Sequence, residues 1–153
     1  MKEQYIATTR LIERLHRRFL DVVKAELDRL NIEDINNVQA LILFNIGDET
    51  LTVGELTLRG CYLGSNVSYN VRKLVENGYL LQERSTHDRR MTRVRLSPKG
   101  HELVRKIDAF YGRTAAELAE FGLDVERLGR TNEVLERLDR FWSIHLSRLA
   151  LIR

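Results

Sequence analysis

The 153-residue chain contains very little cysteine and proline, with one residue of each. A single thiol, Cys61, excludes an intramolecular disulfide and any zinc site that needs two or more thiolates. The sequence also lacks a basic leader with an apolar core and any apolar run of about 18 residues, the length that spans a bilayer. We therefore expect a cytoplasmic protein in a reducing compartment, with no metal and no cofactor.

The composition is that of a globular domain, with 43% hydrophobic and 31% charged residues, and the length predicts one domain over residues 1–153. The net charge of +3 is unevenly placed. Between Arg59 and Arg95, eight basic residues stand against three acidic ones, a local balance of +5, so the remaining chain carries −2. A positive patch confined to one segment favours binding to a polyanion, although a solvated charged face is the alternative interpretation.

The absence of proline and glycine from Lys2 to Leu30 predicts one helix, about 42 Å long. Its apolar positions form two neighbouring stripes, wider than an ordinary surface helix needs, so we expect it to pack both on its own domain and on a partner subunit. His16 lies in the first stripe, where a buried core histidine or a ligand contact is expected. The first stripe contains Tyr5, Ile12, His16, Phe19, Leu20, Val23, Leu27 and Leu30, and the second contains Leu11, Leu15 and Val22.

Helix-start signals recur further along the chain. Asn36 followed by Gln39 predicts a capping box, and Gly47 predicts the end of that helix. Thr52 followed by Glu55 repeats the capping signal and predicts the first helix of a helix-turn-helix.

The next helix begins near Ser65 and places Val67, Val71, Leu74 and Val75 on one apolar arc. Its opposite side carries groups that can bond base edges or phosphates. Asn66 suits adenine, Arg72 suits guanine, and Tyr69 suits a thymine methyl group or a phosphate. The residues on or beside this polar face are Ser65, Asn66, Ser68, Tyr69, Arg72, Lys73 and Glu76. Taken alone, such a face is also typical of an ordinary solvated helix.

Two predicted strands follow, Leu80–Arg84 and 92–96, joined by a polar loop that is too long for a tight turn. The loop contains His87, Asp88, Arg89 and Arg90, and an arginine-tipped loop suits a narrow, electronegative minor groove. The carboxylate of Asp88 would be repelled by DNA unless it orients an arginine, and Arg90 is the obvious candidate.

Two long helices are predicted after the hairpin. Ser97 and Pro98 form a cap and a first helical position, Gly122 ends that helix, and Asp124 starts the last one. The last helix carries a wide apolar stripe that suggests a subunit interface. The stripe comprises Val134, Leu135, Leu138, Phe141, Trp142, His145, Leu146 and Leu149.

This order of elements, with Asp88 and Arg90 in the hairpin loop and a strand running into Leu96-Ser97-Pro98-Lys99-Gly100, resembles the MarR family of transcriptional regulators. The resemblance implies a mainly α fold with a small β-hairpin wing. A winged helix-turn-helix core at about 36–100 would be flanked by long dimerisation helices at about 1–32 and 101–153. It also implies a homodimer on pseudo-palindromic double-stranded DNA, released in many members by a small aromatic effector.

Carried onto this chain, the resemblance gives each DNA contact a role. The major groove would be contacted by Ser65, Asn66, Ser68, Tyr69, Arg72 and Lys73. Arg90, positioned by Asp88, would enter the minor groove, with Arg84, His87 and Arg89 beside it. The effector pocket is expected near His16, Phe19 and Leu43, where one polar group lies among apolar ones.

Other functions compete with this one. An enzyme is disfavoured, because neither a nucleophile motif, a phosphate-binding loop nor a zinc helix motif is present, and we expect no catalytic residues. A winged helix used for protein or RNA contacts would share the fold without binding an operator. A redox-sensing regulator is a further alternative, in which Arg59 would favour the reactive thiolate of Cys61.

Overall fold

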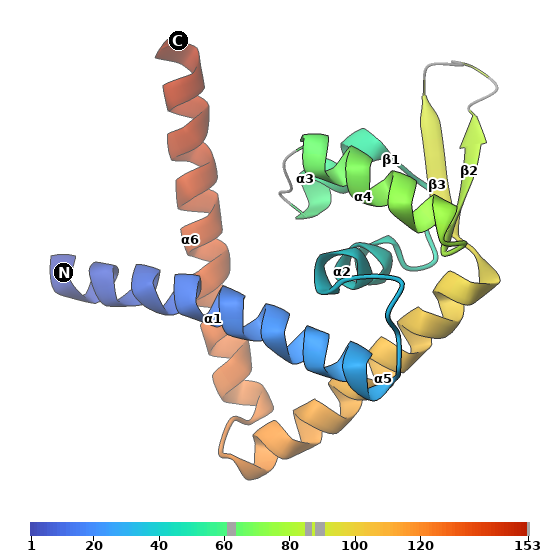
Figure 1. Ribbon diagram of the computed structural model, residues 1–153. Coiled ribbons are helices and arrows are strands. Elements are labelled where there is room, and N and C mark those ends of the chain that lie inside the picture. The colour runs from blue at the N-terminus through green and yellow to red at the C-terminus, as the bar shows by residue number, and fades with distance from the viewer. Residues whose placement is uncertain (61–63, 85–86, 88–90, 153) are drawn as a thin grey trace. The chain divides into compact units, whose positions relative to one another are not determined.

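The computed structural model describes residues 1–60, 64–84, 87 and 91–152, with the backbone alone at Gly64 and Ser65. These residues form six helices and three short strands, shown in Figure 1. In chain order they are α1 (Lys2–Arg29), α2 (Asn37–Ile46), β1 (Leu51–Thr52), α3 (Val53–Gly60), α4 (Gly64–Glu76), β2 (Leu80–Arg84), β3 (Thr92–Leu96), α5 (Pro98–Glu120) and α6 (Val125–Ile152). The predicted fold class, mainly α with a small β-hairpin, is confirmed.

The chain divides into two compact units, Met1–Phe110 and Tyr111–Arg153, each of which is described by itself. The first unit holds the helices α1 to α4, the three strands and the N-terminal part of α5. The second holds the rest of α5 and all of α6. Within the described ranges, no helix combines the length and the apolar content needed to cross a membrane.

Both predicted capping boxes are present. The backbone N–H of Gln39 donates to Asn36 Oδ1 at 2.8 Å, and the Gln39 side chain accepts from the Asn36 N–H at 3.0 Å. Thr52 and Glu55 exchange the same two bonds, each at 3.1 Å, at the start of α3. These local bonds satisfy N–H groups that a helix start leaves unpaired, which is why both starts could be predicted from adjacent residues.

The three strands form one antiparallel sheet in the order β1-β3-β2. The predicted hairpin is confirmed, with Leu80 opposite Leu96 and Gln82 opposite Val94. The two-residue strand β1 was not predicted, because the sequence indicated only a helix cap at Thr52. Leu51 pairs with Val94 in the sheet, so the segment that caps α3 also closes the sheet edge.

The core of the first unit lies between the sheet and the helices α2, α3 and α4 (Figure 1). The α4 side chains Val67, Val71 and Leu74 are at most 2% exposed, which confirms the predicted apolar arc. The polar face of α4 must therefore point away from the core. The largest fully buried side chains are Ile42, Leu43, Ile46, Leu56, Leu74, Leu80, Leu96, Val67 and Val94.

Only the C-terminal third of α1 is buried, at Val23, Glu26 and Leu27. The start of α2 meets α1 at Leu20, whose backbone carbonyl accepts from Asn37 Nδ2, and the N-terminal part of α1 runs well past α2 in Figure 1. His16 is consequently exposed, and its interpretation as a buried core residue is wrong for the single chain. Large apolar side chains also remain exposed along the helix, namely Tyr5, Ile6, Leu11, Leu15, Phe19 and Val22.

No residue of α6 is buried within the chain. Phe141 is 60% exposed and Leu146 is 64% exposed, and both belong to the predicted apolar stripe. A helix that carries such a stripe and has no buried residue presents a large apolar surface to water. The other large exposed apolar side chains of α6 are Val125, Leu128, Val134, Leu135, Ile144, Leu149, Leu151 and Ile152.

At Gly100, α5 closely approaches the backbone that leads into β2. A Cβ atom at Gly100 would lie 2.3 Å from the carbonyl oxygen of Tyr79, a backbone atom that cannot move independently. We expect Gly100→Ala to destabilise the fold by about 1–3 kcal/mol, the usual cost of overpacking. The measurement is the urea midpoint of unfolding.

Gly112 provides a matched control in the same helix, because an added Cβ atom there meets nothing within 4 Å. Gly112→Ala should stabilise the protein by about 0.5–1 kcal/mol, since alanine has the higher helix propensity. Equal midpoints for the two variants would contradict the close approach at Gly100.

Candidate nucleic-acid interface

The exposed face of α4 carries most of the residues that were predicted to contact the major groove. Asn66, Ser68 and Arg72 are exposed, and Tyr69 is 54% exposed. Ser65 lies in the first turn of α4, where only its backbone is described. Because Val67, Val71 and Leu74 anchor the opposite side, the helix presents an amide, a hydroxyl, a phenol and a guanidinium to solvent together.

Lys73 is a predicted DNA contact whose ammonium group already interacts with two neighbours on α4. Its ammonium lies 3.3 Å from Glu76 Oε2 and 5.9 Å from the centre of the Tyr69 ring. The side chains of Lys73 and Glu76 are 43% and 54% exposed, and such a surface ion pair contributes only about 0–1 kcal/mol. The pair is weak enough for Lys73 to exchange Glu76 for a phosphate.

Asn70, a residue of α4 that the sequence interpretation passed over, connects the helix to α2. Its Oδ1 accepts a 3.1 Å hydrogen bond from Gln39 Nε2, and Gln39 is only 6% exposed. The other end of the Gln39 amide completes the α2 capping box with Asn36. One side chain therefore fixes both the start of α2 and the middle of α4.

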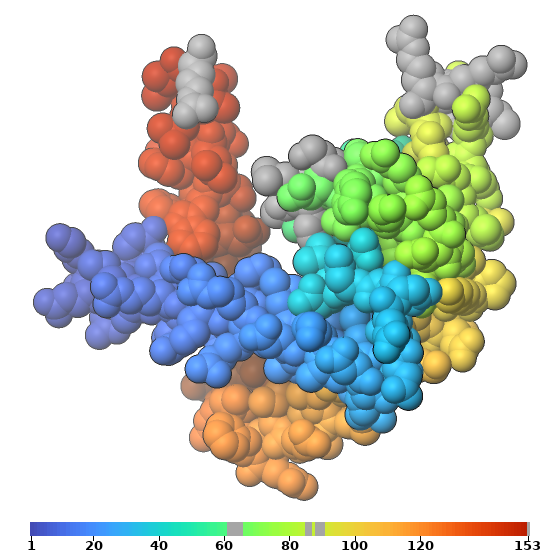
Figure 2. Space-filling model, in the orientation of Figure 1, coloured from blue at the N-terminus to red at the C-terminus, as the bar shows by residue number. Residues whose placement is uncertain are grey.

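The strands beside α4 form the second part of the surface (Figure 2). Their exposed side chains include Arg84, Arg93 and Arg95 against one acid, Glu83, a balance of +2. Arg95 Nε donates to Glu83 Oε1 at 2.6 Å across the strand pair, which leaves Arg84 and Arg93 to dominate the local potential. As predicted, Arg93 and Arg95 face outward while Val94 and Leu96 are buried.

Some predicted contacts lie outside the described residues. They are Asp88, Arg89 and Arg90 of the hairpin loop. Cys61, the thiol of the alternative redox-sensing function, also lies outside the described residues. His87 is described and exposed. Arg59, which was expected to act on Cys61, donates to the carboxylate of Glu49, and this hydrogen bond holds the pKa of Glu49 below its ordinary value.

A polar junction that the sequence did not reveal surrounds the C-terminal end of α4. Asp34 accepts from the Tyr79 hydroxyl at 2.7 Å and from Lys99 Nζ at 2.9 Å. Its backbone carbonyl accepts from Asn77 Nδ2 at 2.7 Å, and Lys99 Nζ also donates to the Asn77 carbonyl at 2.9 Å. We call these four residues the Asp34 junction. Asp34 and Lys99 are 65 positions apart, which explains why no local pattern indicated the contact.

The junction shifts the pKa of two of its members. Burial alone would raise the pKa of Asp34, but the hydrogen bonds from Lys99 and Tyr79 outweigh burial and hold it below its ordinary value. Burial, followed by the bond to Asp34, raises the pKa of Tyr79. At neutral pH, Asp34 is therefore an ionised acceptor and Tyr79 a neutral donor.

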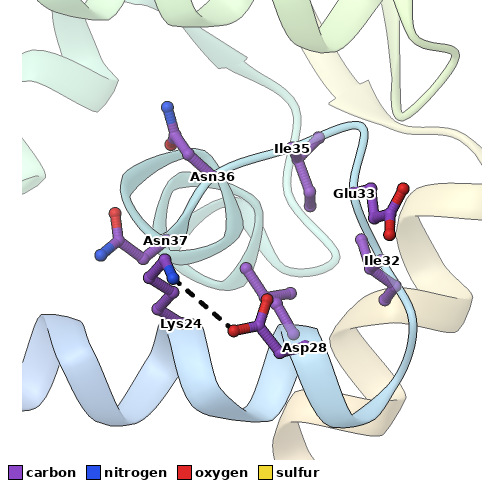
Figure 3. Close-up of a pocket in the computed structure, with 8 residues that line it drawn as sticks. Lys24, Asp28, Ile32, Glu33, Ile35, Asn36 and Asn37 are labelled. Atoms are coloured by element: carbon purple, nitrogen blue, oxygen red, sulfur yellow. Dashed lines mark ion pairs between the residues drawn. The ribbon is translucent and has the colours of Figure 1, made fainter.

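The three residues predicted to wall an effector pocket differ in their exposure. Leu43 is completely buried, whereas His16 and Phe19 lie on the exposed part of α1. A cavity of about 360 Å³ opens instead at the C-terminal end of α1 (Figure 3). It is lined by Lys24, Leu27, Asp28, Ile32, Glu33, Ile35, Asn36 and Asn37.

Comparison with known proteins agrees with this geometry. Residues 35–100 match the family model described as a winged helix DNA-binding domain. The chain is 38% identical over 141 residues to the exopolysaccharide II synthesis transcriptional activator ExpG of Rhizobium meliloti (strain 1021), covering 90% of this chain and 71% of that protein.

Solved structures show the same fold at lower identity. Streptococcus pneumoniae FabT in complex with DNA superposes with a TM-score of 0.73 at 19% identity, over 91% of this chain and 97% of FabT. Staphylococcus aureus MarR in complex with salicylate and kanamycin gives a TM-score of 0.70 at 22% identity, over 92% and 95% of the two chains. With its polar, exposed α4 beside a basic hairpin, the chain belongs to the MarR family of winged helix-turn-helix, DNA-binding transcriptional regulators.

Proposed function

We propose that this regulator acts as a homodimer on a pseudo-palindromic operator, with one α4 in the major groove of each half-site. The observation that carries the proposal is the exposed set Asn66, Tyr69 and Arg72, held on one face of α4 by a fully apolar opposite face. These side chains provide the amide, ring and guanidinium that distinguish base edges in the major groove. The hairpin contributes positive charge for phosphates and for the minor groove, where the undescribed Arg90 is proposed to insert.

The dimer is supported by the uncovered apolar residues of α1 and α6. An exposed stripe that includes Phe141 and Leu146 is far larger than the scattered apolar residues of an ordinary surface. Two-fold symmetry would cover the same stripe on both subunits and would place two copies of α4 on one duplex.

The experiment that tests operator binding is selection of duplexes from a random-sequence DNA library by the full chain. We expect an enriched inverted repeat whose half-site centres are separated by about 10–10.5 base pairs or a multiple of that distance. Recovery of unrelated duplexes with no shared motif would overturn the proposal. A parallel selection with a random-sequence RNA library tests the alternative that the winged helix binds RNA.

A small aromatic acid is the proposed effector, and the cavity beside α1 is its proposed site. Staphylococcus aureus MarR was solved with salicylate, and the cavity volume of about 360 Å³ suits a ligand of that size. Ile32 and Ile35 supply apolar walls, and Lys24 Nζ lies 3.6 Å from Asp28 Oδ2 (Figure 3), so a ligand carboxylate would compete with Asp28 for the ammonium.

Salicylate is therefore expected to raise the melting temperature of the protein and to weaken operator binding. Saturation at 100 times the dissociation constant would add about 2.7 kcal/mol of stability, because the ligand binds only the folded state. Lys24→Met, which removes the ammonium and retains most of its length, should abolish the shift. If salicylate still raises the melting temperature of Lys24→Met, the ligand binds at another site. If salicylate does not raise the melting temperature of the wild type, it is not a ligand of this protein.

A further inference from the structure

The apolar contacts of α4 do not by themselves fix its direction. Val67, Val71 and Leu74 form a single stripe, and because apolar attraction is not directional, we expect this stripe to oppose a small tilt of α4 less strongly than hydrogen bonds do. A helix of 13 residues is about 19 Å long, and a 10° tilt about one end moves the other end by about 3 Å. Hydrogen bonds to base edges tolerate errors of only about 0.5 Å.

Directional bonds hold α4 at two points along its axis. The first is in the middle, where Asn70 accepts from the buried Gln39 of α2. The second is at the C-terminal end, where Asn77 is bonded on one side to the backbone of Asp34 and on the other to Lys99. Because the two points are about two helical turns apart, they oppose a tilt that either alone would permit.

Asp34 supports the second point through its side chain, whereas the two Asn77 bonds themselves use the Asp34 backbone carbonyl and Lys99 Nζ. Its carboxylate binds both Tyr79, which directly follows the turn after α4, and Lys99, in the first turn of α5. Lys99 Nζ also lies 4.3 Å from the centre of the Tyr79 ring, so the ammonium is held by the carboxylate, the ring and the Asn77 carbonyl together. Without the carboxylate, the Tyr79 hydroxyl loses its acceptor and Lys99 keeps only the ring and the carbonyl.

The contacts of α5 complete the attachment. Ser97 Oγ donates to the Gly78 carbonyl at 2.6 Å, and the Ser97 N–H donates to the Tyr79 carbonyl at 3.0 Å. The segment between α4 and β2 is therefore enclosed by the α1–α2 loop on one side and by the start of α5 on the other.

We propose that Asp34 is a positioning residue for sequence recognition: through Tyr79 and Lys99 its carboxylate sets the direction of α4, and the choice of operator over other DNA depends on it. The inference rests on the proposed operator binding. It assigns specificity to a side chain outside α4 and the hairpin.

The test compares the affinities of full-length Asp34→Ala for the selected operator and for an unrelated duplex. The side chains of Asp34 and Lys99 are 43% and 51% exposed, so their ion pair alone is weak, and the bond to Tyr79 adds to it. We expect operator affinity to fall about five- to tenfold, while unrelated duplex is bound as well as before or slightly better, because one negative charge is lost. Simple loss of folded protein would lower both affinities by the same factor, so the ratio separates positioning from stability. If the wild type selects an operator but Asp34→Ala has the same ratio of operator affinity to unrelated-duplex affinity, the proposed role of Asp34 is wrong. If the wild type selects no operator, the proposed function itself is wrong.

Tyr79→Phe keeps the ring under Lys99 and removes only the donor to Asp34, so it covers the case in which Asp34→Ala fails to fold. It should lower the ratio of operator affinity to unrelated-duplex affinity about threefold. The double variant with Asp34→Ala should lose no more of this ratio than Asp34→Ala alone, because both changes break the same contact. Asp48→Ala is the matched control, because it removes a 99% exposed carboxylate from the turn after α2. A drop in the ratio as large in Asp48→Ala as in Asp34→Ala, or independent multiplication of the Asp34 and Tyr79 effects, would contradict the junction.

Discussion

Phe141→Glu is expected to convert the regulator from a dimer into a monomer and to abolish operator binding at concentrations where the wild type binds. Phe141 lies in the α6 stripe and is 60% exposed in the single chain. Burying a side chain of this size contributes about 1.5–3 kcal/mol, and a two-fold symmetric dimer loses this contribution in both subunits. A glutamate adds the cost of an unpaired charge inside an interface. Light scattering with in-line chromatography measures the mass.

Ser147→Glu is the matched control for this experiment. It introduces the same charge six residues further along α6, on the side of the helix opposite the stripe, where Ser147 Oγ donates to the Ser143 carbonyl of its own helix. The control should remain a dimer. A wild-type protein that elutes as a folded monomer at micromolar concentration would contradict the dimer, and a dimeric Phe141→Glu would move the interface away from this stripe.

Arg72→Ala is expected to weaken operator binding by about 1–3 kcal/mol, which is roughly 5- to 150-fold, with a much smaller effect on unrelated duplex. Arg72 is exposed on α4, and no ion pair joins it to any residue in the described ranges. Its guanidinium is therefore available for a two-bond contact with guanine. Titrations of labelled operator and unrelated duplex measure the difference.

Two comparisons sharpen the result for Arg72. Arg72→Lys retains the charge and loses the planar pair of donors, so it should resemble the alanine variant if Arg72 reads a base and the wild type if it neutralises a phosphate. Arg105→Ala removes an exposed arginine of α5 outside the candidate interface and should leave the operator preference unchanged. Equal losses on both duplexes for Arg72→Ala would assign the residue to phosphate binding.

The parts of the fold that could be predicted from the sequence are those set by neighbouring residues. Both capping boxes, the Gly47 stop and the Ser97-Pro98 start act within one helical turn, so their signals are contained in a few positions. The apolar arc of α4 was predictable for the same reason, since residues three and four apart share a helix face.

Contacts between distant segments could not be predicted in this way. The strand β1 exists only because Leu51 meets Val94, 43 positions later, and two residues carry no strand pattern of their own. The exposure of His16 depends on where α2 meets α1, at Leu20, and the periodicity of α1 alone does not indicate that position. The chain offered one indirect signal of the Asp34 junction, the Leu96-Ser97-Pro98-Lys99-Gly100 motif, in which Ser97, Lys99 and Gly100 all meet the segment after α4.

For the candidate interface, the helical wheel predicted which α4 side chains face solvent but not which are engaged by neighbours. Lys73 is paired with Glu76, and Asn70 is bonded to Gln39, a residue of a different helix. The predicted roles of individual residues in base reading and at the minor groove remain predictions.

Equilibrium titration of the selected operator against an unrelated duplex, at several salt concentrations, tests the central claim most directly. The account predicts operator affinity at least about 1,000-fold above that for the unrelated duplex at physiological salt. It also predicts that both affinities fall linearly on a logarithmic scale as salt rises. Equal affinity for the two duplexes at every salt concentration, or tighter binding to RNA than to the operator, would contradict it.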